Sequence, residues 1–191
     1  MSTQLRPALV LFAALSIVTG IAYPLVVTGI AQTIFPKRAS GSLEVVDGKE
    51  RGSRLIGQPF SAPGYFWSRP SATSPAPYDA SGSTGSNVGP TNPALVTAVH
   101  DRVAALRQAD LTLTEPIPVD LVTTSGSGLD PDISLAAAVV QVNRVAAARN
   151  VPAERLRQLV QAHGQDRTLG FLGEPRVNVL LLNLALDRLN P

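Results

Sequence analysis

The feature that most constrains this chain is a run of 30 residues, from Pro7 to Pro36, that contains no charged side chain. The run is bounded by Arg6 and Lys37. A helix of about 20 apolar residues crosses the hydrocarbon core of a bilayer, so this run is long enough to span it with some tilt. The sequence therefore predicts an N-terminal transmembrane helix.

A cleavable signal peptide is the alternative reading of this run. Gly20 and Ala22 form a weak small-x-small cleavage site. The apolar residues continue beyond that site, however, from Leu25 to Ile30. We therefore expect a retained anchor, residues 1–36, followed by one soluble domain, residues 37–191.

The same helix carries small residues at a regular spacing. Ser16, Gly20, Pro24 and Thr28 recur every four residues and so share one face. Small residues allow a second transmembrane helix to approach closely, and Pro24 removes a backbone donor, which predicts a kink. A plain anchor with incidental small residues is the alternative. We favour a helix-docking face.

The charges beside the helix do not settle its orientation. Arg6 precedes the run, whereas several cationic residues follow it: Lys37, Arg38, Lys49, Arg51 and Arg54. A positive-inside count would place the soluble domain in the cytoplasm. A domain of this length can be translocated regardless of nearby charge, so the count is a weak guide.

The composition excludes several classes of function. A formal net charge of +2, without a basic cluster, does not fit a nucleic-acid partner. The chain has no cysteine, which excludes a disulfide framework, a cysteine-ligated zinc site and a thiol nucleophile. It has only two histidines, so we expect no metal site.

Apolar periodicity and capping residues predict four helices in the soluble domain. Asn92-Pro93 is a favourable helix start, Ser134 is a cap for the next helix, and Gly164 ends the third. On the Ser134-capped helix the buried stripe is predicted to be Leu135, Ala138, Val139, Val142, Val145 and Ala146. The predicted helices span about 92–108, 134–149, 152–163 and 178–189.

Strands are predicted to be few. Apolar or β-branched runs indicate them at 42–46, 54–57 and 117–124. Residues 68–93 are rich in Ser, Thr, Pro, Gly and Asn and predict a long loop, either functional or a solvated tether. The predicted fold class is a single N-terminal transmembrane helix plus one small α/β (α+β) soluble domain.

The sequence offers little for catalysis, and we predict no catalytic residue. Neither a Walker-type phosphate loop nor a serine-hydrolase elbow is present. The turn from Ser125 to Gly128, expected between a strand and a helix, could hold an anion on its N–H groups, although Asp130 and Asp132 oppose this. A purely structural turn is the favoured alternative.

Gln141 is the most informative polar residue outside that turn. It flanks an Ala/Val stripe, with Arg144 and Arg149 on the same flank. Its amide could bond a partner, a core carbonyl or a nucleotide. An internal hydrogen bond that fixes the nearby turn is favoured, because buried amides usually find internal partners.

Several motifs, in order along the chain, resemble the KdpC family, the small subunit of the bacterial Kdp potassium-transporting ATPase. They are Gly64–Ala72 (GYFWSRPSA), Ser81-Gly82 with Gly85-Ser86-Asn87, Asn92-Pro93, Val119–Thr123 with Ser125 and Ser127–Asp130, Gln141 with Arg144–Ala146 and Ala148–Asn150, and Val177–Val179 with Leu182–Asp187. The chain departs from the family pattern in three places. Ser83-Thr84 is an insertion, Asn143 stands where proline is common, and Asp132 stands where several relatives have histidine.

The resemblance implies a non-catalytic accessory subunit of an ATP-driven potassium import complex. Its partners would be the potassium-translocating and ATP-hydrolysing subunits and membrane lipid, and its location the bacterial inner membrane, with the soluble domain extracytoplasmic. The family is also described as a catalytic chaperone that raises the ATP affinity of the pump, which makes ATP a candidate cofactor. The resemblance implies nucleotide contact at Gln141, and we add Ser125 and Ser127 of the turn as candidate contacts. An external domain cannot reach cytoplasmic ATP, so the structural role is favoured.

Overall fold

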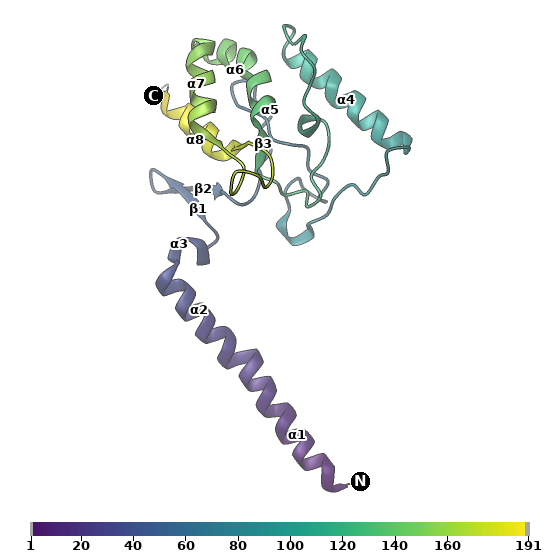
Figure 1. Ribbon diagram of the computed structural model, residues 1–191, viewed down its shortest axis with the longest axis vertical. Coiled ribbons are helices and arrows are strands. Elements are labelled where there is room, and N and C mark those ends of the chain that lie inside the picture. The colour runs from purple at the N-terminus through teal and green to yellow at the C-terminus, as the bar shows by residue number, and fades with distance from the viewer. Residues whose placement is uncertain (1, 190–191) are drawn as a thin grey trace. The chain divides into compact units, whose positions relative to one another are not determined.

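The computed structural model describes residues 2–189 (Figure 1). The chain divides into two compact units, Met1–Glu50 and Arg51–Pro191. The first unit is dominated by one long helix, which a short helix follows, and the second unit holds the other helices and a small sheet. The fold class predicted from the sequence is confirmed.

The first unit begins with one continuous helical stretch made of three parts. They are α1 (Ser2–Ile17), a π-helical turn (Val18–Ala22) and α2 (Tyr23–Ile34). Within residues 2–189, this is the one helix, Thr3–Ile34, that is long and apolar enough to cross a membrane. A short helix, α3 (Pro36–Ala39), follows it.

The π turn lies directly before Pro24, the residue at which a kink was predicted. The Tyr23 N–H donates to the Val18 carbonyl five residues earlier, instead of four. In a regular α-helix the Pro24 ring would press against the carbonyl of Gly20, and no N–H would reach that carbonyl. The wider π turn directly before Pro24 relieves this crowding.

A hairpin follows, formed by β1 (Leu43–Val46) and β2 (Lys49–Ser53). The second strand was predicted at 54–57, and that prediction is wrong, because residues 54–56 form a turn. The reason lies in Asp47-Gly48, whose φ angles are 53° and 73°. An Asp-Gly pair with two positive φ angles makes a two-residue hairpin, so the second strand starts immediately after it.

The helices of the second unit agree closely with the prediction. Asn92 caps its helix by accepting from the Ala94 N–H at 2.9 Å, and Ser134 accepts from the Ala137 N–H at 3.0 Å. The segment after Ser134 is two helices, because the backbone turns at Gln141. The helices are α4 (Pro93–Ala109), α5 (Leu135–Val140), α6 (Val142–Arg149), α7 (Ala153–His163) and α8 (Val179–Leu189).

The sheet of the second unit is short and antiparallel. Its order is β3 (Asp132–Ser134), β5 (Arg176–Asn178), β4 (Gly164–Gln165). The strand predicted at 117–124 is wrong, since this segment contains only a 3-10 turn, Val119–Leu121. Pro116 and Pro118 have no N–H to donate to a ladder, and Leu121 and Val122 after them reach the core without strand pairing.

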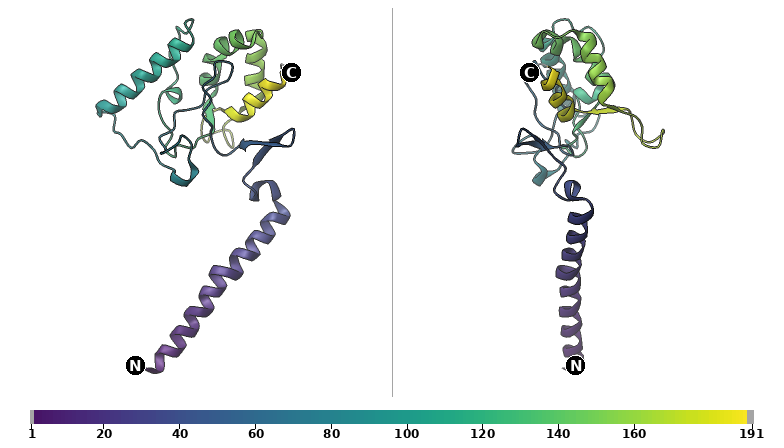
Figure 2. Two further views of the ribbon diagram at one scale, coloured as in Figure 1. Left: turned by 180° about the vertical axis from the view of Figure 1, so that it is seen from behind. Right: turned by 90° about the vertical axis from the view of Figure 1, so that its left-hand side faces the viewer.

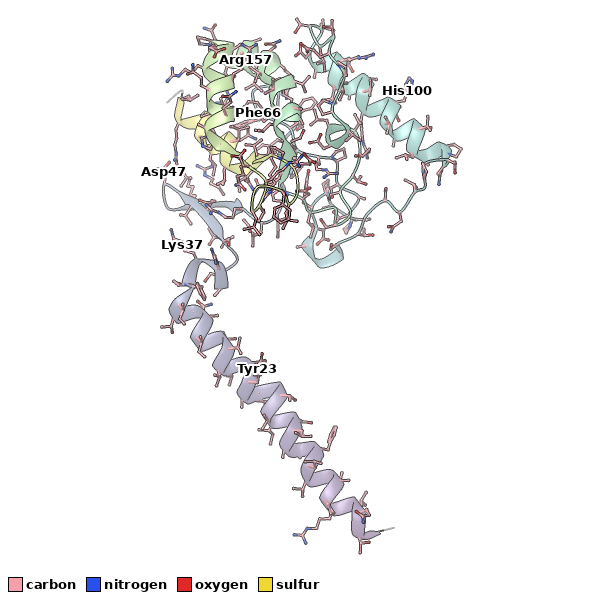
Figure 3. The ribbon with its side chains drawn as sticks, viewed as in Figure 1. Tyr23, Lys37, Asp47, Phe66, His100 and Arg157 are labelled. Carbon is pink, nitrogen blue, oxygen red and sulfur yellow. The ribbon has the colours of Figure 1, made fainter. Side chains whose placement is uncertain are left out.

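The core lies among α5, α6, α7 and α8, which cluster together in both views of Figure 2. Phe66 is fully buried in this cluster (Figure 3), whereas His100 lies on the exposed side of α4. Val139 was predicted to be in the buried stripe, but it is 45% exposed. The α5–α6 break at Gln141 changes which side chains face inward.

The segment at 68–93 is a loop, as predicted, with one 3-10 turn at Ala80–Gly82. It is not a solvated tether, however. Thr73 is buried, and the Thr84 N–H donates to the Ser127 carbonyl at 3.0 Å. The loop is therefore packed against the turn that begins at Ser125.

Candidate functional site

The segment from Pro63 to Trp67 has no regular secondary structure, yet its backbone is hydrogen-bonded. Side chains supply the partners. Asn183 of α8 accepts from the Phe66 N–H at 2.9 Å and donates to the Phe66 carbonyl at 3.0 Å. Buried backbone groups must find such partners, because an unpaired one costs as much as a lost hydrogen bond.

Gln141 does the same for the next residue. Its Oε1 accepts from the Trp67 N–H at 2.7 Å, and its Nε2 donates to the Trp67 carbonyl at 3.2 Å. The amide also donates to the Ala137 carbonyl at 3.0 Å and accepts from Arg144 at 2.6 Å. All four hydrogen-bonding positions of this amide are thus engaged, and the side chain is buried.

Two arginines complete the arrangement. Arg144 donates to the carbonyls of Pro63 and Tyr65 at 2.6 and 3.0 Å, and its guanidinium lies 4.2 Å from the Trp67 ring centre. Arg149 donates to the Gly64 carbonyl at 2.8 Å. Burial lowers the pKa of Arg144 to about 10, which leaves it charged at neutral pH.

We call Gln141, Arg144, Arg149 and Asn183 the polar clamp. Its members come from α6, α8 and the α5–α6 break, and they hold a segment that lies about 75 to 120 positions away in sequence. They replace the neighbouring strand that the 63–67 segment lacks. These side chains form hydrogen bonds with the chain's own backbone.

The turn at Ser125–Asp130 is held by the 68–93 loop and by Gly57. Ser71 Oγ donates to the Gly128 carbonyl at 2.7 Å, and the Gly57 N–H donates to the Leu129 carbonyl at 2.9 Å. Gly128 has a φ of 69°, and a Cβ there would lie 2.5 Å from the Thr84 carbonyl oxygen. Carbonyl oxygens of the turn therefore face the 68–93 loop, which packs closely against it.

Arg69 links this turn to the polar clamp's segment. It forms an ion pair with Asp130 at 2.9 Å and donates to the Thr124 carbonyl at 3.3 Å. Tyr78, whose hydroxyl donates to the Arg69 carbonyl, packs beside it, and burial raises the pKa of Tyr78.

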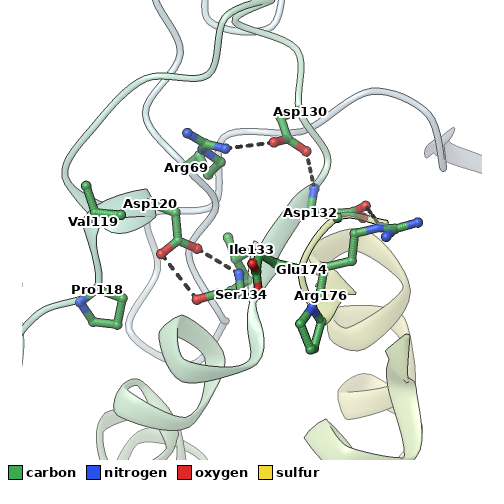
Figure 4. A pocket seen from close by; sticks show the side chains of 12 residues that line it. Arg69, Pro118, Val119, Asp120, Asp130, Asp132, Ile133, Ser134, Glu174 and Arg176 are labelled. Carbon is green, nitrogen blue, oxygen red and sulfur yellow. Dashed lines mark hydrogen bonds and ion pairs between the residues drawn. The ribbon is translucent and has the colours of Figure 1, made fainter. Parts of the chain in front are cut away.

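A cavity of about 480 Å³ opens beside these residues (Figure 4). Asp120 accepts from the N–H and the hydroxyl of Ser134, and Arg176 donates to Asp132 at 3.0 Å. Burial and then the neighbouring Asp130 raise the pKa of Asp132. The charged side chains that line the cavity are four carboxylates and two guanidiniums: Asp120, Asp130, Asp132, Glu174, Arg69 and Arg176. This excess of carboxylates opposes a phosphate ligand.

The residues predicted for nucleotide contact are only partly together. Ser125 and Ser127 line a second cavity, of about 520 Å³, with Arg69 and Asp130. Gln141 is not among its lining residues, because it is buried under Trp67. Nor does the turn precede a helix directly, since β3 lies between it and α5. The expected juxtaposition of strand, turn and helix start is therefore wrong.

The predicted docking-face residues all lie exposed on the long helix: Ser16, Gly20, Pro24 and Thr28. Four residues advance an α-helix by about 40° more than one turn, so such a stripe drifts around it. The π turn holds more residues per turn and offsets part of that drift. A Cβ at Gly20 would meet nothing within 4 Å in this chain.

The polar clamp was only half visible in the sequence. Gln141 was singled out, and an internal bond was favoured for it, but its partner is Trp67 and not the 125–130 turn. Asn183 was missed. Its signal was a single amide inside the apolar run from Val179 to Leu186.

Fold and site together define a protein with one helix suited to crossing a membrane and a small α+β body braced by its own buried polar side chains. Among residues 2–189, no group of three or more His, Cys, Asp or Glu is placed to hold a metal ion. The chain belongs to the KdpC family, since the family model described as "K+-transporting ATPase, c chain" matches residues 5–188.

Similar proteins extend over the whole chain. A potassium-transporting ATPase KdpC subunit of Polaromonas naphthalenivorans is 60% identical over 191 residues, covering 100% of this chain and 97% of the relative. Those of Burkholderia ambifaria and Methylibium petroleiphilum are 59% and 58% identical. The first alignment covers 98% of this chain and 97% of the relative, and the second covers both chains completely.

Proposed function

We propose that this chain is an accessory subunit of an ATP-driven potassium import complex. It is anchored in the bacterial inner membrane by its N-terminal helix and stabilises the assembly of the subunits that translocate potassium and hydrolyse ATP. The observation that carries the proposal is the end-to-end similarity to potassium-transporting ATPase KdpC subunits, 58% to 60% identical.

The polar clamp supports a structural contribution without catalysis by this chain. Gln141 and Asn183 are amides, and each is engaged on both sides with backbone groups. Arg144 is turned toward carbonyl oxygens and the Trp67 ring. Side chains committed in this way brace a surface that partners can bind, and they are not free to act on a substrate.

The test is reconstitution of the pump with and without this chain. We expect the complex that lacks it to lose potassium-stimulated ATP hydrolysis and to dissociate in detergent, and the chain alone to hydrolyse no ATP. Full potassium-stimulated activity in its absence would exclude the accessory role. ATP hydrolysis by the chain alone would exclude a non-catalytic one.

We place the body outside the cytoplasmic membrane. The chain contains no cysteine, so a single introduced cysteine can be labelled without background. Leu111 is 90% exposed and suits this purpose. A Leu111→Cys chain should react with a membrane-impermeant maleimide on intact cells, whereas a cytoplasmic body would react only after lysis.

A second candidate is direct ATP binding by a regulatory subunit, which would raise the ATP affinity of the pump as a catalytic chaperone. One observation favours it: Ser125 and Ser127 line an open cavity together with Arg69. It predicts saturable heat on titration of the full chain with ATP, abolished in a Ser125→Ala/Ser127→Ala double variant. The absence of heat at millimolar ATP would remove it.

A further inference from the structure

The segment between β4 and β5 forms a hairpin that extends away from the helices (Figure 2, right). Thr168 and Leu172 exchange two backbone hydrogen bonds, each 2.9 Å long. At the base of the hairpin, Arg167 forms an ion pair with Glu174 at 2.7 Å. We call residues 167–174 the hairpin. Its bonds fix the conformation of its tip.

The tip of this hairpin is apolar and exposed. Leu169 is 79% exposed, Phe171 69% and Leu172 49%. These three side chains lie within four consecutive residues on a projecting element, and none of them belongs to the core. Contiguous exposed apolar side chains are typical of interaction sites, whereas single ones are ordinary.

Leu169 is also in an unfavourable backbone conformation. Its φ is 56°, in the left-handed region that glycine and asparagine tolerate and a bulky side chain does not. A turn selected for stability and solubility would carry asparagine here. Leu169 breaks both the conformational and the solvation preference, and such departures concentrate at functional positions.

We propose that the hairpin tip is a docking element that inserts Leu169 and Phe171 into an apolar pocket of a partner protein subunit. This inference rests on the proposed function, because the partner is another chain of the potassium-transporting ATPase. An aromatic side chain at the centre of such a contact is a usual source of binding energy, and a rigid element loses little entropy on binding.

The charges around the tip favour a protein pocket over the bilayer surface. Segments that insert into anionic membranes carry unpaired Lys or Arg side chains beside their apolar residues. Here the two nearest arginines are neutralised, Arg167 by Glu174 and Arg176 by Asp132. Asp166 adds a negative charge. A lipid headgroup layer therefore gains little from this tip, whereas an uncharged protein pocket suits it.

The test is retention of this chain by the assembled ATPase in detergent, where no bilayer is present. We expect Leu169→Asn and Phe171→Ser each to reduce retention at least about tenfold. In the isolated full chain, Leu169→Asn should keep or raise Tm, because asparagine accepts the positive φ. Leu111→Ser, which removes an even more exposed leucine elsewhere, should change neither measurement.

The outcomes separate the alternatives. Wild-type retention by Leu169→Asn and Phe171→Ser in detergent would overturn the docking element while leaving the proposed function intact. The same retention combined with weaker flotation on vesicles of anionic phospholipid would assign the tip to the bilayer and equally overturn a partner pocket. If the wild-type chain itself did not co-purify, the proposed function would fail, and this inference with it.

Discussion

Asn183 and Phe66 are joined by a closed ring of two hydrogen bonds, although 117 positions separate them in the sequence. The amide accepts at 2.9 Å and donates at 3.0 Å, as the backbone of a neighbouring strand would. Phe66 can therefore bury its ring completely without leaving its own backbone unpaired. The same logic applies to Gln141 and Trp67 one residue later.

The first prediction concerns the two hydrogen bonds between the Asn183 amide and the Phe66 backbone. Asn183→Ala leaves a buried N–H and a buried carbonyl of Phe66 without partners, and we expect it to lower the free energy of unfolding by about 3 kcal/mol. Trp67 is the only tryptophan, so its fluorescence reports unfolding of the body in the full chain. Asn143→Ala, at an exposed position of α6, should change stability by less than about 0.5 kcal/mol. Equal losses of unfolding free energy in Asn183→Ala and Asn143→Ala would refute the stabilising role of the hydrogen bonds between Asn183 and Phe66.

The helices could be predicted because their signals are local. Asn92 and Ser134 directly precede the first residues of their helices, and Gly164 directly follows the last residue of its helix. Apolar periodicity then identifies the buried face. Neither signal depends on the rest of the chain, which is why α4, α7 and α8 were placed to within about two residues.

The sheet and the polar clamp could not be predicted, because they depend on distant pairings. β3 and β5 are three residues long, and Ile133 faces Val177 across more than forty positions of sequence. The run at 117–124 looked like a strand from its β-branched residues alone, but Pro116 and Pro118 have no N–H to donate to a ladder. An amide such as Asn183 shows that some polar partner exists, without showing which one.

The second prediction uses two glycines of one turn. A Cβ at Gly128 would lie 2.8 Å from Thr73 Cγ2 and would also require a φ of 69°, so Gly128→Ala should destabilise the chain by about 2 kcal/mol. Gly126→Ala meets nothing within 4 Å and should be close to neutral. Urea unfolding of both variants measures the difference. Similar stabilities would mean that the 68–93 loop does not pack on this turn.

The third prediction is a pH dependence at Asp132. Burial, followed by the charge of Asp130, raises the folded-state pKa of this carboxyl, although Arg176 and Asn178 oppose the shift. The folded state therefore binds the proton more tightly than the unfolded state, and the stabilisation is lost as pH rises through the raised pKa. The stability of wild type relative to Asp132→Asn should fall as pH rises from the ordinary carboxyl pKa through the raised pKa of Asp132, and should then level off.

Urea unfolding of both chains across that range is the measurement for Asp132. Its informative quantity is the difference between the two free energies of unfolding at each pH, since changes at other carboxylates cancel in it. A difference that stays constant, or one that grows with pH, would show that Asp132 titrates no higher in the folded chain than in the unfolded one.

The last prediction addresses the helix-docking face of Ser16, Gly20, Pro24 and Thr28. A leucine at Gly20 meets nothing within this chain, so Gly20→Leu should leave its own stability unchanged and act only where another helix approaches. Gly29 is equally open and lies nine residues on, roughly half a turn around the helix. If the face docks, Gly20→Leu releases the chain from the detergent-solubilised complex while Gly29→Leu does not. If both variants co-purify as the wild type does, the small residues are incidental and the helix is a plain anchor.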